Sequence, residues 1–148
     1  MFNKILVALD GSEHADRALE MAIDIARKYD ASLLLFHAIQ VNLQVRNSTF
    51  SGRVADAAKE AYRKIGREIA EEIIAKASAR AAAAGLERVE SLFVEGEPAT
   101  SIIDTAAREQ ADLLVLGTRG MSGLRQIIVG SVAHKVTIAA HAPVLVTK

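Results

Sequence analysis

The feature that most constrains the fold is a regular alternation of short apolar runs with longer amphipathic segments. The runs are rich in Leu, Ile and Val, and they lie at 4–9, 32–38, 89–94, 112–116 and 143–147. Continuous apolar runs of this length are typical of strands that are buried on both faces. The resulting β-α-β-α-β-α-β-α-β order predicts an α/β fold, an open five-stranded parallel sheet with helices on both faces.

Capping residues mark where the predicted helices begin. Ser12 is a good N-cap for a helix that ends near Tyr29, because its hydroxyl can accept from an amide of the first turn. Pro98 suits the first position of a later helix. The last helix is expected from Ser131 to about Ala140, with the Ser131 hydroxyl capping it. The inner face of the helix after Pro98 is predicted to comprise Ile102, Ile103, Ala106 and Ala107.

The longest predicted helix covers 55–84, a segment rich in Ala, Glu, Lys and Arg. About thirty residues of helix would be roughly 45 Å long, which is more than the sheet needs, so the far end could contact a partner. Gly85 supplies a stop signal. Residues 40–54 show no clear period and are predicted to form a long connection. The apolar stripe of the long helix is expected to be Ile65, Ile69 and Ile73.

Composition narrows the class of protein. A length of 148 residues suits a single domain covering 1–148. Lys plus Arg equals Asp plus Glu at 18 each, which gives no reason to expect binding to nucleic acid or to a membrane surface. The sequence has no cysteine, and no apolar run approaches the roughly eighteen residues of a membrane span. We therefore expect a cytoplasmic protein.

The stretch 117–131, GTRGMSGLRQIIVGS, concentrates backbone freedom and positive charge after the fourth predicted strand. Gly117 and Gly120 can adopt a positive φ and let a ligand approach the backbone closely. Gly130 precedes Ser131, and the free amides of a helix N-terminus form a natural anion site. These residues favour a phosphate site, to which Arg119 and Arg125 would add positive charge.

Spacing alone leaves a phosphate site and a plain surface loop both open. The stretch is not a Walker loop, because Ser131-Val132 follows Gly130 where that motif requires Lys-Ser or Lys-Thr. A second unusual loop, Asp10-Gly11-Ser12, follows the first predicted strand. Both loops would face one crevice if the strand order were 3-2-1-4-5, but the residues themselves do not fix that order.

Several segments in one order resemble the universal stress protein family. The pattern Gly117-x2-Gly120-x9-Gly130-Ser131 is similar to its ATP-binding signature, G-2x-G-9x-G-(S/T). The opening KILVALDGSEHADRALEMAIDIA, the strand LLLFHAI, the helix entry GEPATSIIDTA and the C-terminal third match as well. The resemblance implies a Rossmann-like sheet of order 3-2-1-4-5, an adenine nucleotide as ligand, and a homodimer that pairs through the C-terminal strand.

Site residues follow from the same resemblance. Asp10 would lie by the ribose and adenine, and Ala38 would meet the adenine through its backbone. Ala8 stands where some ATP-binding members have proline, a difference that affects packing near the base. Leu116 and Val132 would be apolar and backbone neighbours. The ribose and phosphates would be held by Gly117, Gly120, Gly130 and Ser131, with Arg119 as a candidate phosphate ligand.

Three functions fit these residues. The favoured one is an ATP-binding regulator of the stress response that acts as a dimer on an unidentified protein partner. The second is a slow ATPase or autophosphorylating enzyme using Mg²⁺, although Asp10 is the only acid near the predicted site. The third is a dimeric interaction protein whose nucleotide site is structural or empty. No histidine pair has metal-ligand spacing; we expect His134 to be solvated and His37 to be hydrogen-bonded in the core.

Overall fold

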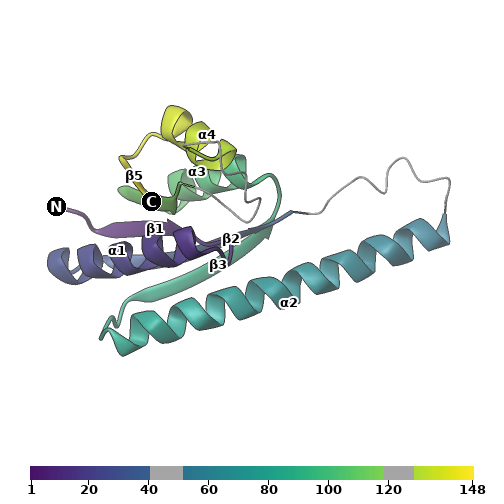
Figure 1. Ribbon diagram of the computed structural model, residues 1–148, viewed down its shortest axis with the longest axis horizontal. Helices are drawn as coiled ribbons and strands as arrows, with labels where there is room; N and C mark the ends of the chain where they lie inside the picture. The colour runs from purple at the N-terminus through teal and green to yellow at the C-terminus, as the bar shows by residue number, and fades with distance from the viewer. Residues whose placement is uncertain (41–51, 119–128) are drawn as a thin grey trace.

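A five-stranded parallel sheet forms the centre of the molecule (Figure 1). The computed structural model describes residues 1–40, 52–118 and 129–148. The strand order is β3-β2-β1-β4-β5, and every neighbouring pair is parallel. This confirms the predicted fold class and strand order. The strands are β1 (Lys4–Ala8), β2 (Ser32–Ile39), β3 (Val89–Glu95), β4 (Leu113–Gly117) and β5 (Val144–Thr147).

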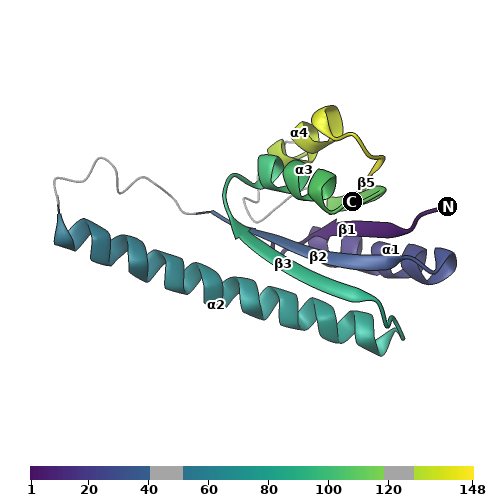
Figure 2. The ribbon, with the colours of Figure 1, turned by 180° about the vertical axis from the view of Figure 1, so that it is seen from behind.

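Helices cover both faces of the sheet, as Figures 1 and 2 show from opposite sides. Two of them, α1 and α2, lie on one face, and α3 and α4 lie on the other. The alternation of side chains along a strand explains this division. In β1, Ile5 and Val7 join the core under α1 and α2, whereas Leu6 joins the core under α3 and α4. The helices are α1 (Glu13–Tyr29), α2 (Arg53–Ala83), α3 (Pro98–Arg108) and α4 (Ser131–Ala139).

Most of the predicted helix boundaries are confirmed. Ser12 caps α1, since its hydroxyl oxygen accepts from the Ala15 amide at 3.2 Å. Pro98 is the first residue of α3. Gly85 follows α2 with a φ of +83°, a conformation that strains any residue with a side chain. The predicted cap at Ser131 is wrong: Gly130, which has no side chain, is the N-cap residue of α4, and Ser131 is the first residue of that helix.

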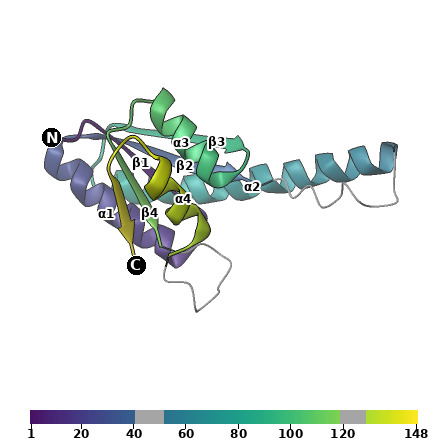
Figure 3. The same ribbon diagram turned by 90° about the horizontal axis from the view of Figure 1, so that it is seen from above.

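The predicted apolar stripe of α2 is also wrong in its main part. Ile65 and Ile69 are 53% and 50% exposed, and Ile73 is only partly buried. Figure 3 shows that the N-terminal end of α2 extends past the end of the sheet, where it has no strand beneath it. Where α2 does cross the sheet, small residues allow close packing, and the buried side chains are Ala70, Ile74, Ala77 and Ala81.

Two smaller differences concern α3 and the segment before α2. Ala107 is exposed in α3, and Thr105 is buried instead, together with Ile102 and Ala106. Of the predicted connection 40–54, residues 41–51 lie outside the described part of the chain, and Arg53 and Val54 belong to α2. Among the described residues, no helix combines the length and the apolar character needed to cross a membrane.

Candidate functional site: a cleft at the carboxyl ends of the strands

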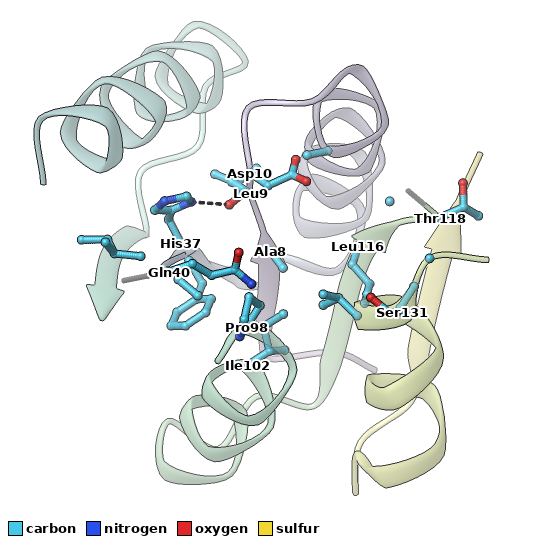
Figure 4. A pocket seen from close by; sticks show the side chains of 18 of the residues that line it. Ala8, Leu9, Asp10, His37, Gln40, Pro98, Ile102, Leu116, Thr118 and Ser131 are labelled. Carbon is cyan, nitrogen blue, oxygen red and sulfur yellow. Dashed lines mark hydrogen bonds between the residues drawn. The ribbon is translucent and has the colours of Figure 1, made fainter. Parts of the chain in front are cut away.

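A cleft of about 650 Å³ lies at the carboxyl ends of β1, β2 and β4, and Figure 4 shows it from close by. The first residues of α3 and α4 and part of α2 complete its wall. The order β3-β2-β1-β4-β5 reverses direction between β1 and β4, and this is where open parallel sheets bind ligands. The volume is within the range of small-molecule sites.

The loop after β1 presents a carboxylate to the cleft. Asp10 lines it, and the Asp10 Oδ1 atom accepts from the Ser12 amide at 2.9 Å. Gly11 has a φ of +81°, which lets the chain turn sharply into α1. A Cβ atom on Gly11 would lie 3.4 Å from Ile73 Cδ1 of α2. The bond to the Ser12 amide orients the Asp10 side chain, which lies at the cleft (Figure 4).

The end of β4 and the start of α4 form the opposite side of the cleft. Gly117, Gly130 and Ser131 line it. A Cβ atom on Gly117 would lie 2.6 Å from His14 Cβ and 2.7 Å from the His14 carbonyl carbon, so only glycine fits against α1 here. Because the N-cap residue Gly130 has no side chain to cap α4, the amides of its first turn can donate to another acceptor. This end of the cleft is suited to an anion.

Thr118 ties this end of the cleft to the neighbouring elements. Its amide donates to the Thr147 carbonyl of β5 at 2.7 Å, and its carbonyl accepts from the Gly130 amide at 2.5 Å. Its hydroxyl lies 3.2 Å from the His14 Nδ1 atom. The two flanks of the glycine-rich stretch are thus joined by hydrogen bonds. Sequence analysis missed Thr118, although its position directly after a buried strand was a usable signal.

Small apolar residues form the part of the cleft between β1, β2 and α3. Ala8 and Ala38 line it together with Pro98 and Ile102 of α3 (Figure 4). The two alanines leave room where a larger side chain would fill the cleft. His37 also lines it, and its Nδ1 atom donates to the Leu9 carbonyl at 2.7 Å. The predicted hydrogen bonding of His37 is confirmed, but its place in the cleft wall was not foreseen.

A polar link joins α3 to α4 beside the cleft. The Glu97 carboxylate accepts from the Thr100 amide at 2.8 Å and from Lys135 Nζ of α4 at 3.3 Å. The pKa of Glu97 is lowered from 4.5 to about 2, mainly by the Thr100 amide, with smaller contributions from the Thr100 hydroxyl and Lys135. Glu97 therefore caps α3 as an anion at neutral pH and connects the helices that carry Pro98 and Ser131.

The fold brings most of the predicted site residues together. Arg119 and Gly120, and also Arg125, lie outside the described residues. His134 is exposed, as expected. Within the described residues, no group of three or more His, Asp or Glu side chains is placed to hold a metal ion. The predicted residues that line the cleft are Ala8, Asp10, Ala38, Leu116, Gly117, Gly130, Ser131 and Val132.

The comparison with protein-family models gives one match over residues 1–148, to the universal stress protein family. The chain belongs to the universal stress protein family. The universal stress protein YxiE of Bacillus subtilis is 35% identical, and the alignment covers 100% of both chains.

Two solved structures support the same conclusion. Universal stress protein UspA from Lactobacillus plantarum has a TM-score of 0.87 at 23% identity, covering 99% of this chain and 98% of its own, which is evidence for the fold. A universal stress protein in complex with cAMP is 30% identical with a TM-score of 0.73, and the match covers 99% of this chain and 97% of that protein.

Proposed function

We propose that this protein is an ATP-binding regulator of the stress response, in which the cleft holds the nucleotide. The observation that carries the proposal is the shared location of three segments far apart in the sequence. Asp10, Ala38 and the pair Gly130-Ser131 line one cleft at the point where the strand order reverses. A relative of 30% identity in complex with cAMP supports an adenine nucleotide as the ligand.

The triphosphate lies, in this proposal, at the start of α4. The uncapped amides of the first turn and the exposed Ser131 hydroxyl can donate to phosphate oxygens. Gly117 lets β4 end close against α1, because a Cβ atom there would meet His14, and its backbone lines the same end of the cleft. Gly120 and Arg119 extend the same site as predicted from the family signature, with the arginine supplying positive charge.

The adenine and ribose lie toward β1 and β2. Ala8 and Ala38 provide a flat apolar surface, and Ile102 lies on the α3 side of the same space. Asp10 is placed to accept from ribose hydroxyls, since its carboxylate lies in the wall between β1 and α1 (Figure 4). Leu116 and Val132 close the apolar wall between the base and the phosphates.

Binding rather than hydrolysis is the proposed activity. Phosphoryl transfer needs an oriented nucleophile and a metal ion held by acids. Asp10 is the only carboxylate among the described residues that line the cleft, and its Oδ1 atom is engaged by the Ser12 amide. A magnesium ion would therefore be held mainly by the nucleotide's own phosphates and by water.

The protein is further proposed to act in the cytoplasm as a homodimer that signals to a protein partner. β5 is the edge strand of the sheet beyond β4, and its side chains Val144, Leu145 and Val146 are only partly buried. An apolar edge of this kind favours pairing with a second strand. Light scattering at micromolar concentration should return the mass of a dimer, and a monomer would contradict the pairing.

The main proposal is tested by looking for nucleotide that stays bound to the protein through purification. The purified protein is boiled, and the supernatant is separated by ion-exchange chromatography to detect ATP, followed by calorimetric titration with ATP and with GTP. We expect ATP to bind in preference to GTP. The proposal would be refuted if the protein retained no nucleotide and also gave no heat of binding at millimolar ATP. Turnover that disappears when Mg²⁺ is chelated would instead favour an ATPase.

A further inference from the structure

The cleft continues past Ala38 toward the opposite face of the sheet, where α2 forms its wall. Ile39 is the next residue of β2 and faces α2, since a Cβ atom on Gly66 would lie 2.6 Å from Ile39 Cγ2. Gly66 and Ile69, one turn apart on α2, both line the cleft. We call the space lined by His37, Ile39, Gly66 and Ile69 the α2 compartment.

The α2 compartment is apolar and partly open. Ile39 is buried, Gly66 has no side chain, and Ile69 is 50% exposed although it is an isoleucine on the wall of a cleft. The polar side chains beside this space are His37, whose Nδ1 atom donates to the Leu9 carbonyl, and Gln40, which also lines the cleft. An apolar group that entered this space would cover the exposed part of Ile69.

The orientation of the bound nucleotide brings one edge of the base to this compartment; this step rests on the proposed function. The phosphates lie at Ser131, beside β4, and the base lies at Ala8 and Ala38, beside β1 and β2. The ligand therefore runs across the strand ends in the direction of β2. The edge of adenine opposite the glycosidic bond carries the exocyclic amino group, and it points onward to β2 and α2.

We propose that the α2 compartment receives an apolar substituent on the exocyclic amine of adenine. The ligand class of the cleft is then wider than ATP, and it includes adenine nucleotides with an N6-alkyl or N6-aryl group. Ile69 is the residue that determines this specificity, because the substituent would bury its exposed side chain. The gain in affinity over ATP should be about fivefold, since most of the new contact is apolar and the compartment already exists.

The chain offers a matched pair of positions for the test. Ile65 and Ile69 lie one turn apart on α2, are 53% and 50% exposed, and differ in that only Ile69 lines the cleft. The experiment measures the Kd of ATP and of N6-benzyl-ATP by calorimetry, for the full-length protein and for the Ile69→Ala and Ile65→Ala variants. Both substitutions are at half-exposed positions, and thermal unfolding of each variant verifies that it is folded.

We expect N6-benzyl-ATP to bind the unchanged protein about fivefold more tightly than ATP. Ile69→Ala should remove this advantage, so that the two ligands bind the variant with equal affinity, and Ile65→Ala should keep the fivefold difference. Binding of ATP together with tenfold weaker binding of N6-benzyl-ATP would overturn the inference while the proposed function stands. Equal losses for both ligands in Ile69→Ala would also overturn it. Failure of both ligands to bind would refute the proposed function, and the inference with it.

Discussion

The two ends of the cleft are built in different ways. The end proposed to hold the phosphates, here called the phosphate end, lies at Gly117, Gly130 and Ser131 and consists of backbone, glycine and a helix terminus. The end proposed to hold the base, here called the base end, lies at Ala8 and Ala38 and consists of small apolar side chains that leave space. A backbone site needs particular residues at particular positions, so it leaves a motif in the sequence. A site made by missing side-chain volume leaves none, because alanine is common throughout this chain.

The largest expected effect comes from adding one methyl group at the phosphate end. In Gly117→Ala the new Cβ atom would meet the His14 backbone at 2.7 Å and its Cβ atom at 2.6 Å, so α1 must shift. We expect a loss of about 1–3 kcal/mol in the free energy of unfolding, measured by urea denaturation, and a loss of ATP binding.

Gly96→Ala is the matched control for Gly117→Ala. Its Cβ atom would meet the Ser101 hydroxyl at 2.5 Å, and a rotation of that side chain can relieve the contact. Equal destabilisation by the two substitutions would show that the contact between Gly117 and α1 is not special.

A larger side chain at the base end should show whether the two ends of the cleft bind independently. In Ala38→Leu the larger side chain would occupy the space beside Pro98 and Ile102. We expect the Kd of ATP to rise at least about tenfold, because the leucine side chain would exclude the adenine from its proposed site. The Kd of inorganic tripolyphosphate should stay unchanged. Calorimetry measures both constants. An equal rise in the Kd of tripolyphosphate would show that the two ends do not bind independently.

Removing one hydroxyl tests the phosphate end alone. Ser131→Ala should raise the Kd of both ATP and tripolyphosphate about tenfold, because a hydrogen bond to a charged group is lost. Ser131→Thr keeps the hydroxyl and should keep the affinity. Stability should not change, because Ser131 is exposed and does not cap α4. Destabilisation of the protein with ATP affinity unchanged would assign Ser131 a structural role instead.

The smallest effect concerns the link between α3 and α4 through Glu97 and Lys135. Folding lowers the pKa of Glu97 from 4.5 to about 2, so the anion stabilises the fold above pH 4.5, and this contribution is lost as the pH falls toward 2. Because the side chain is 47% exposed, the contribution should be only about 0.5–1 kcal/mol. Glu97→Gln should therefore be less stable at pH 7, and urea denaturation should show the difference vanish near pH 2. A constant difference would contradict this.

Much of the fold could be predicted from the sequence, because buried strands and helix signals are local. Ser12, Gly85 and Pro98 marked helix ends correctly. The order of the strands came from family resemblance, since the side chains that pair β1 with β4 are interchangeable aliphatic residues. Ile65 and Ile69 misled the prediction for α2, because periodicity indicates an apolar face but cannot show where the sheet beneath it ends.

The candidate site was predictable to a different degree at each end. Gly117, Gly130 and Ser131 were singled out by their resemblance to the family signature, since spacing alone left a plain loop open, and all three line the cleft. His37, Pro98 and Ile102 were not assigned to the cleft, since each has an ordinary role in a core or a helix start, and only the meeting of β2 with α3 places them in it. The misplaced cap at Ser131 has a related cause: Gly130, which has no side chain, takes the N-cap position, and Ser131 becomes the first residue of α4.

The central claim, that one nucleotide spans both ends of the cleft, is tested most directly by titrating the isotope-labelled protein with ATP and following the amide NMR signals. We predict shifts at Ala38 of the base end and at Gly130 and Ser131 of the phosphate end, all saturating with one Kd. Inorganic tripolyphosphate should shift only the phosphate end. Shifts confined to one end with ATP, or outside the cleft altogether, would contradict the account.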